Sequence, residues 1–189
     1  MILDGLLAFT ATVAGGNPSV GDSLINATGT FNTSNVLDLG LIGLPLSSAG
    51  GGARDLGIGD DPALKILAEL TTAVAGTTGT TTLQLVLQGA PDNGSGVPGS
   101  YYNMILSPVY TFVTGAQLGV AGQRLLEVDV PRYPEGQPVP RFLRLQYIIG
   151  GASITAGVLE ALIVLDRFDQ IGAQTAILSG YPAGINIAN

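Results

Sequence analysis

The feature of this sequence that most constrains its fold is a series of short runs in which apolar and polar residues alternate. The clearest run is TLQLVLQ at residues 82 to 88. Successive side chains of a β-strand point to opposite faces, so alternation indicates a strand with one face on a hydrophobic core. The core face would carry Leu83, Leu85 and Leu87, and the opposite face Gln84, Val86 and Gln88.

Six further runs have the same character: VLDLG at 36 to 40, LKILAEL at 64 to 70, MILSPVYTFV at 104 to 113, RLLEVDV at 124 to 130, FLRLQYII at 142 to 149 and ITAGVLEALIVLD at 154 to 166. Turn-forming residues separate these runs, and the chain has 28 Gly and 11 Pro among 189 residues. The spacing predicts an all-β protein, an antiparallel β-sandwich of the jelly-roll type from about residue 35 to 170, with at most short helical turns. An immunoglobulin-like sandwich is the alternative, although its Cys and Trp landmarks are absent.

Two of these runs allow more specific predictions. In RLLEVDV, we expect Leu126, Val128 and Val130 to face the core and Leu125, Glu127 and Asp129 to face outward. Residues 154 to 165 are apolar on both faces except at Glu160, which indicates a strand in the centre of a sheet or beneath another subunit. A helix is the alternative there, but the Thr, Gly, Val and Ile content favours a strand.

The length of the chain fits one domain. Residues 1 to 34 are predicted to form an N-terminal arm or a peripheral strand packed on the domain. Residues 35 to 189 are predicted to form a single jelly-roll domain with a C-terminal extension. The loops between the predicted strands are too short to link separate domains.

The composition argues against several classes of function. The chain has no Cys and no His, which removes thiolate and imidazole catalysis and the usual zinc, copper and haem ligands, so we expect no enzyme activity, no metal and no cofactor. Seven scattered cations and a net charge of −7 argue against nucleic acid as a partner. The longest apolar stretch is shorter than the roughly 20 residues that span a membrane, and the N-terminus, with Asp4 and no basic residues, does not resemble a secretory signal.

The sequence also predicts an unusual surface. Only 11% of the residues are charged, the mean hydropathy is +0.44, and six of the seven cations are Arg. Arginine is suited to bidentate pairing with carboxylates at interfaces. We therefore expect much of the surface to be covered by another protein, as in obligate assemblies; a Gly- and Ala-rich monomer is the alternative.

One loop contains two motifs that imitate ligand sites. GSGVPG at 94 to 99 has the spacing of a dinucleotide-binding turn, but Pro98 lies inside it and SYYNMILSP follows where a helix should begin, so a hairpin loop is the simpler interpretation. Asp92, Asn93 and Ser95 could offer oxygens to Ca²⁺, but carboxylates are few and an Asn-Gly turn explains these residues better.

Two further patterns also have simpler explanations. Glu127 and Asp129 could be imagined as a glycosidase pair, but such pairs come from opposite sides of a cleft. We interpret them as a solvated strand face, or as partners for Arg124 or Arg144 on a neighbouring strand. PRYPEGQPVPR at 131 to 141 has the spacing of a polyproline ligand and is interpreted as a stiff connector.

The ordered set of these segments resembles a known family. The segments are MILDGLLAF at the start, NVLDLG at 35 to 40, ARDLGIGDDPALKILAEL at 53 to 70, TLQLVLQ, LSPVYTF at 106 to 112, RLLEVDVPR at 124 to 132, RFLRLQYIIGG at 141 to 151 and ITAGVLEALIVLDR at 154 to 167. Along most of its length the chain is similar to the Bbp16-type capsid cement proteins of tailed bacteriophages. It departs from their pattern at residues 11 to 34 and by an insertion at 41 to 52.

The resemblance implies a jelly-roll protein without an active site, synthesised in the cytoplasm of a bacterial host. It would bind the outside of an assembled icosahedral head and tie neighbouring major capsid subunits together. A protein that bridges symmetric subunits is expected to form a homodimer, with a trimer as the second choice. The alternative function is a carbohydrate- or receptor-binding module of a viral surface structure, for which Tyr101 and Tyr102 are the one clustered aromatic pair.

The insertion and the arginine just after it supply the predicted contact residues of this interface: Leu41, Ile42, Leu44, Leu46 and Arg54. Four large apolar side chains in a loop require cover, because each contributes roughly 1.5 to 3 kcal/mol when buried. We predict that they anchor in a neighbouring subunit or the capsid surface, with Arg54 pairing with an acidic group beside them. Packing against the protein's own sandwich as an extra edge is the alternative.

Overall fold

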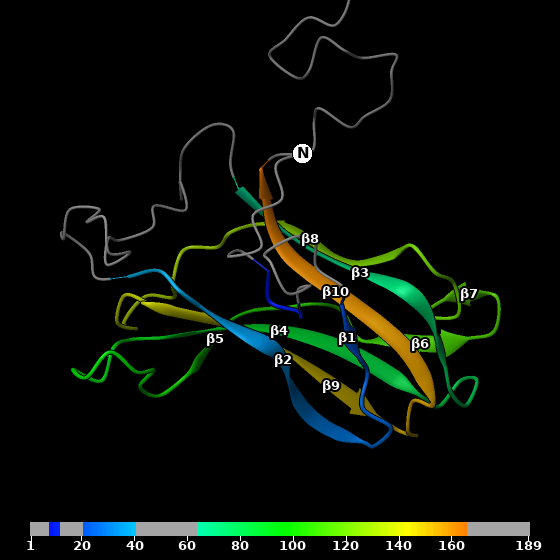
Figure 1. Ribbon diagram of the computed structural model, residues 1–189. Helices are drawn as coiled ribbons and strands as arrows, with labels where there is room; N and C mark the ends of the chain where they lie inside the picture. The colour runs from blue at the N-terminus through cyan, green and yellow to red at the C-terminus, as the bar shows by residue number, and fades with distance from the viewer. Residues whose placement is uncertain (1–7, 12–20, 41–63, 166–189) are drawn as a thin grey trace, which may run out of the picture.

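The computed structural model describes residues 8–11, 21–40 and 64–165, and these residues form ten β-strands, most of which contain the alternating runs of the sequence (Figure 1). The strands are β1 (Asp22–Ser23), β2 (Gly29–Asp38), β3 (Leu64–Ala75), β4 (Thr82–Ala90), β5 (Tyr102–Leu106), β6 (Tyr110–Val113), β7 (Ala116–Gln117), β8 (Gln123–Asp129), β9 (Phe142–Gly150) and β10 (Ala156–Leu165). None of the described residues lies in a helix, and so none forms a helix that could cross a membrane.

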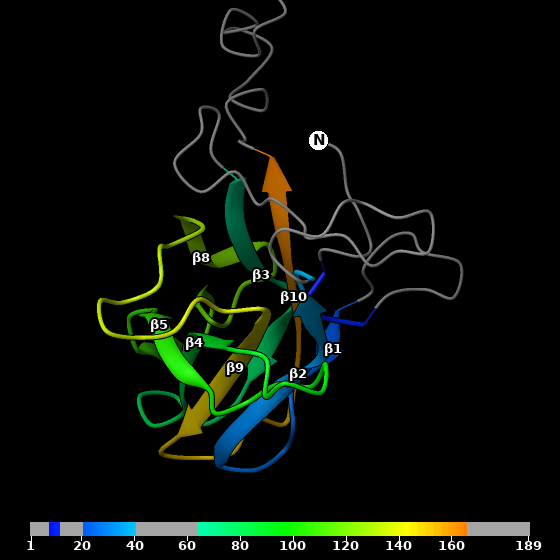
Figure 2. The ribbon, with the colours of Figure 1, turned by 90° about the vertical axis from the view of Figure 1, so that its left-hand side faces the viewer.

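The strands form two antiparallel sheets that pack face to face, as the two views in Figures 1 and 2 show. One sheet has the order β1-β10-β3-β8, and the other has the order β2-β9-β4-β6-β7 with β5 also paired to β4. A core of buried aliphatic and aromatic residues from both sheets fills the space between them. The predicted all-β antiparallel sandwich is confirmed.

The pairing of the strands is nested along the chain. β1 pairs with β10, β2 with β9, β3 with β8, and β4 with both β5 and β6. The first described strand thus pairs with the last, the second with the second-last, and so on inward to the middle of the chain. This is the pattern of one long antiparallel hairpin whose successive pairs lie alternately in the two sheets.

The predicted faces of β4 are confirmed. Its three leucines are fully buried in the core between the sheets, and the side chains of Gln84 and Gln88 are half-buried on the opposite face. Val86, which lies between these two glutamines on the outward face, is also buried. β4 is therefore a central strand whose outward face is polar but crowded.

The predicted orientation of Leu125 in β8 is wrong. Ala68 of β3 pairs with Leu126, and the next residue of β3, Glu69, pairs with Arg124, so Leu125 is the extra residue of a β-bulge. Leu125 is 2% exposed and lies in the core beside Leu126. A bulge puts two residues opposite one and breaks strict alternation, which allows two consecutive leucines to face inward.

The other two assignments along the chain have different outcomes. Residues 156 to 165 form a strand between β1 and β3, so the predicted central strand is confirmed. The run at 104 to 113 forms two strands where one was expected, because the chain is interrupted at Ser107. The Ser107 N–H donates to the carbonyl of Leu85 at 2.9 Å, and its Oγ accepts from the Leu85 N–H at 2.9 Å, so the hydrogen bonds of β4 are kept across the interruption.

Residues of the first 34 take part in both sheets. Phe9 is buried, and its N–H donates to the carbonyl of Ala161 in β10 at 2.8 Å. The carboxylate of Asp22 in β1 accepts from the N–H of Ala11 at 3.0 Å and from the N–H of Ser34 at 2.7 Å. This buried carboxylate therefore joins three separate segments of the N-terminal region.

Candidate interaction site

The predicted anchor residues Leu41, Ile42, Leu44, Leu46 and Arg54 lie outside the described residues. The structure does describe the point from which their segment departs. The chain leaves β2 at Asp38, passes Gly40, and is described again from Leu64, the first residue of β3. The surroundings of Asp38 therefore determine where this segment begins.

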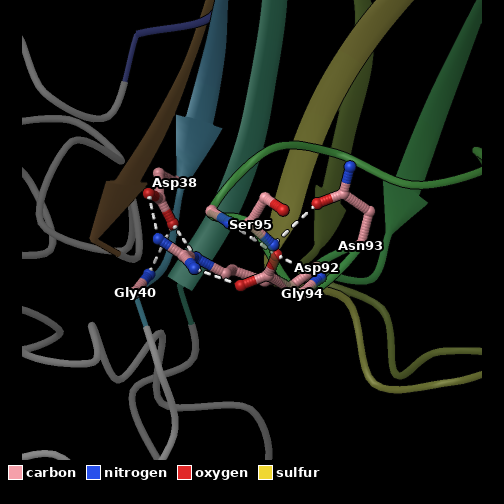
Figure 3. A network of polar contacts seen from close by, with 8 residues as sticks. Asp38, Gly40, Asp92, Asn93, Gly94 and Ser95 are labelled. Carbon is pink, nitrogen blue, oxygen red and sulfur yellow. Dashed lines mark hydrogen bonds and ion pairs between the residues drawn. The ribbon is translucent and has the colours of Figure 1, made fainter.

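Arg141, which immediately precedes β9, holds this point in place. Its Nε and Nη2 donate to the two carboxylate oxygens of Asp38 at 2.8 and 2.9 Å, and its Nη1 donates to the carboxylate of Asp92. Figure 3 shows the guanidinium between the two labelled carboxylates. A bidentate arginine pair has fixed geometry, so this contact joins the end of β2 to the loop after β4.

Backbone contacts complete this arrangement at the end of β2. The Leu39 N–H donates to the carbonyl of Arg141 at 2.8 Å, and the Gly40 N–H donates to Oδ1 of Asp38 at 2.8 Å. Gly40 has a φ of +78°, which an L side chain rarely adopts, so a glycine suits this sharp exit. We call the residues Asp38–Gly40 and the loops 91–101 and 130–141 the clamp end of the sandwich.

The loop after β4 is a tight turn, as predicted. Oδ1 of Asp92 accepts from the N–H groups of Gly94 and Gly96, both at 2.9 Å, and Oδ1 of Asn93 accepts from Ser95 N–H at 2.9 Å. Gly94 has a φ of +93°, as the predicted Asn-Gly turn requires. Both oxygens of Asp92 are therefore used within the protein, and the GSGVPG segment connects two strands that both belong to the same sheet.

The same contacts shift the pKa values of two groups in the clamp, the name we use for Arg141 together with Asp38 and Asp92. Desolvation raises the pKa of Asp92, but hydrogen bonds from Gly96, Gly94 and Arg141 outweigh it and lower the pKa below its ordinary value. The hydrogen bond to Asp38, opposed by desolvation and reinforced by Asp92, raises the pKa of Arg141. Arg141 is therefore a permanent cation that contacts the carboxylates of Asp38 and Asp92, and its hydrogen bond helps to keep Asp92 ionised at neutral pH.

The predicted role of Glu127 and Asp129 is resolved only in part. Glu127 pairs with Arg124 at 3.0 Å on the exposed surface of β8. Arg124 was expected on a neighbouring strand but lies on the same one. Arg144 is not a partner, because β9 belongs to the other sheet. An exposed pair of this kind contributes little to stability.

The outward face of the six-stranded sheet has a different character. Its side chains are mainly uncharged amides with a few aliphatic groups: Asn32 and Val36 of β2, Arg144, Gln146 and Ile148 of β9, Gln84, Val86 and Gln88 of β4, and Asn103 and Leu106 of β5. We call this set the amide face. Arg144 is the one charged member of this set, and Asp38, two residues beyond Val36 in β2, carries a carboxylate at the end of the same face.

Hydrogen bonds between side chains run across the amide face. Gln146 Nε2 donates to Asn32 Oδ1 at 2.8 Å, linking β9 to β2. On the other side, Arg144 Nε donates to Gln88 Oε1 at 2.8 Å, and Gln88 Nε2 donates to Asn103 Oδ1 at 2.7 Å. The guanidinium of Arg144 lies 3.5 Å from the ring centroid of Tyr101. Four strands thus contribute to one ordered polar surface.

The outward face of the four-stranded sheet is acidic by comparison. Adjacent strands bring together six charged side chains, four carboxylates and two cations: Glu69, Glu127, Asp129 and Glu160 with Lys65 and Arg124. We call this set the acidic face. Beside it, Ala8, Leu67, Leu162 and Val164 form a small buried cluster. The outward faces of the two sheets therefore differ in how many carboxylates they carry.

Sequence reasoning missed both Arg141 and Arg144 as the centres of ordered contacts. The signal for Arg144 was present in part, because LRLQY at 143 to 147 alternates like TLQLVLQ and so predicts outward polar side chains. What the sequence lacked was the register that puts Arg144 opposite Gln88 and Val36. No model of a known protein family matches the chain, and no curated protein sequence matches it.

Proposed function

We propose that the sandwich is a jelly roll. In that fold, a long antiparallel hairpin rolls up so that its successive strand pairs alternate between two sheets. The nested pairing supports this assignment: if β5, β6 and β7 are counted together as one edge, the two sheets have the orders first-eighth-third-sixth and second-seventh-fourth-fifth. The two short edge strands and the interruption at Ser107 divide what would otherwise be a single strand.

We further propose that the protein is a capsid cement protein of a tailed bacteriophage, which binds the outside of the assembled head and bridges neighbouring major capsid subunits. The resemblance of the ordered sequence segments to that family suggests this role. The observation that carries it in the structure is the clamp at Arg141. It fixes the point from which the apolar segment 41–46 departs, and a rigid departure point lowers the entropy lost when such a segment binds.

The surroundings of the clamp support a docking role for this end of the sandwich. Val97 and Val139 of its two loops are exposed, as is Tyr133. The hydroxyl of Tyr102, at the start of β5 directly after the first loop, donates to the carbonyl of Pro138 in the second loop at 2.7 Å. Exposed apolar groups on tied loops are typical of surfaces that bury apolar area on binding.

The experiment is made on virions. Under this proposal the protein is present at hundreds of copies on each purified particle, and particles lacking it release their DNA at a lower temperature. Binding only to the assembled shell stabilises that state in proportion to the logarithm of the excess ligand over its Kd. Identical release temperatures with and without the protein would contradict a cementing role.

The anchor is tested by the double substitution Leu44→Ser with Leu46→Ser. We expect loss of head binding with an unchanged melting temperature of the free protein. Val120→Ser is the control, because Val120 is exposed between β7 and β8, outside the clamp end. A lowered melting temperature with head binding retained would assign the segment to the protein's own core.

The alternative of a carbohydrate-binding module gains no specific support from its two candidate rings. One face of Tyr101 is covered by the Arg144 guanidinium, and the Tyr102 hydroxyl is used in the contact with Pro138. Sugar recognition on such folds relies on free aromatic faces for stacking. The structure offers no such pair from these two residues.

A further inference from the structure

Arg144 of β9 differs from Arg141, which precedes this strand, in what its guanidinium contacts. Arginine has five N–H donors. Arg144 uses Nε toward Gln88, and within the described part of the chain its four terminal N–H groups have no hydrogen-bond partner. Arg144 is half-buried, so its charge is only partly solvated. This leaves a fork of donors of the shape that a carboxylate accepts.

The orientation of this fork is fixed before any partner arrives. The Nε bond to Gln88 defines one edge of the guanidinium, and the ring of Tyr101 supports its plane at 3.5 Å. Gln88 is itself held by its hydrogen bond to Asn103. A partner would therefore bind an arginine that has already lost most of its side-chain freedom, which improves affinity.

From these contacts we propose that Arg144 is a docking point for the carboxylate of an Asp or Glu side chain on the capsid protein. This inference rests on the proposed cement function and deepens it. A protein that bridges two subunits needs two contact regions, and the amide face supplies a second one in addition to the clamp end. The bond formed is a bidentate ion pair, with no covalent change.

The charge distribution argues for this face over the other. A carboxylate that approaches the acidic face meets four carboxylates and two cations, whereas near Arg144 the carboxylate of the same face, Asp38, is already paired with Arg141. Like charges brought together cost several kcal/mol in an interface, so the acidic face would exclude such a partner. The electrostatic contrast thus orients the protein on its partner.

The neighbours of Arg144 favour a protein over an acidic sugar as the source of the carboxylate. Val36 is 46% exposed directly opposite Arg144, and Leu106 is 53% exposed on the same face. Aliphatic groups around an Arg and a Tyr, with Lys, Asp and Glu absent from the set, form the composition of a protein interface core. A sugar would need a free ring, and Tyr101 gives one face to Arg144.

The first test measures binding of variants to heads that lack the protein. Arg144→Gln should weaken binding at least 10-fold, and Arg144→Lys should bind with intermediate strength because it keeps the charge without the fork. Arg124→Gln, on the acidic face, is the matched control and should bind like the wild type. The melting temperature of each free variant should stay near that of the wild type. Equal binding by Arg144→Gln and the wild type would overturn the inference and leave the cement function intact.

The second test needs no capsid. Acetate is added to the isotope-labelled free protein while the Nε–H resonances of its arginines are followed by NMR. Arg144 should shift at lower acetate concentration than Arg132, and Arg141, which already donates to two carboxylates, should not shift. If the wild type fails to bind heads, the cement function is wrong. The acetate titration still tests whether the Arg144 guanidinium binds a carboxylate.

A null result with acetate would overturn the inference. An acidic polysaccharide, polygalacturonate, provides the last arm of the test. If it binds through Arg144 while heads bind Arg144→Gln normally, the carboxylate belongs to a glycan, and the assignment to the capsid is wrong.

Discussion

Arg141 and Arg144 stand three residues apart at the beginning of β9, yet their surroundings are opposite. Arg141 donates to two carboxylates, one at the end of β2 and one in the loop after β4. Among the described residues, the Arg144 guanidinium donates to a neutral amide and lies over an aromatic ring. The first arginine holds the end of β2 to the loop after β4, whereas most donors of the second have no hydrogen-bond partner in the described part of the chain.

The comparison shows how little residue type says about role. Arg141 immediately precedes β9 and Arg144 lies within it, so the two arginines are three positions apart in one short segment. Their difference comes from the loops: the connections at the clamp end bring acidic side chains to Arg141, whereas the middle of the sheet surrounds Arg144 with residues of β4 and β5. Four predictions test this difference, beginning with the largest effect.

Leu145→Ala should have the largest effect because it removes the support that both regions share. Leu145 follows Arg144 in β9 and is fully buried in the core. A substitution of this kind in a core costs about 2 to 5 kcal/mol of the free energy of unfolding. Chemical denaturation measures it, and Ile148→Ala on the outward face of the same strand is the control and should cost less. Equal costs for the two variants would mean that the two faces of β9 do not differ in packing as described.

Arg141→Gln should lower the melting temperature clearly, because it leaves two carboxylates close together without their cation. Thermal unfolding at low ionic strength checks it. Adding Asp38→Asn and Asp92→Asn to the same chain should recover part of the loss, since the repulsion is then removed. No recovery would indicate that the guanidinium acts through packing and not through its charge.

The pH dependence of stability should report the clamp through Asp92. Its pKa is lowered in the folded protein, so the unfolded chain binds the proton more readily, and the contribution of this carboxylate is present above its ordinary value of 3.8. The contribution is lost as pH falls through the lower, folded pKa. Melting temperatures measured between pH 5 and pH 2 should decline less steeply in Asp92→Asn than in the wild type. If the melting temperatures of the two proteins declined in parallel, Asp92 would not contribute to stability through its charge.

Arg144→Gln should have the smallest effect on the free protein. Among the described residues, the Arg144 guanidinium is not paired with a carboxylate. Surface substitutions that break no ion pair and leave the core intact usually change the free energy of unfolding by less than about 0.5 kcal/mol. Denaturation of this variant beside Arg141→Gln makes the comparison direct. A loss as large as that of Arg141→Gln would mean that Arg144 also serves the fold.

The fold could be predicted from the sequence where burial enforces alternation. The leucines of β4 face the core because a period-two pattern leaves few other choices. Leu125 shows the limit: a bulge depends on how β3 and β8 align, and the sequence of β8 alone does not contain that information. The interruption at Ser107 was missed for a similar reason, because its hydroxyl replaces a backbone group of the ladder only in the folded chain.

The candidate site was less predictable. The clamp joins residues that are 49 and 103 positions apart, and without the strand register nothing in the sequence brings them together. The outward polar residues of each strand could be predicted from its own sequence. Predicting that they form one amide face also required the order of the strands in the sheet. The predicted anchor at residues 41 to 46 remains a prediction, and the structure adds to it only the fixed position of the residue that precedes it.

The nested pairing also affects the order in which the strands pair during folding. The central strands β4 and β5 are close in sequence and can meet early, whereas Asp22 must find Leu159 across almost the whole described chain. Closing a longer loop costs more entropy, so pairs should form from the middle outward. During synthesis, β1, β2 and β3 leave the ribosome long before their partners exist. The N-terminal strands therefore lack their pairing partners during most of synthesis, and folding is complete only after the last strand has emerged.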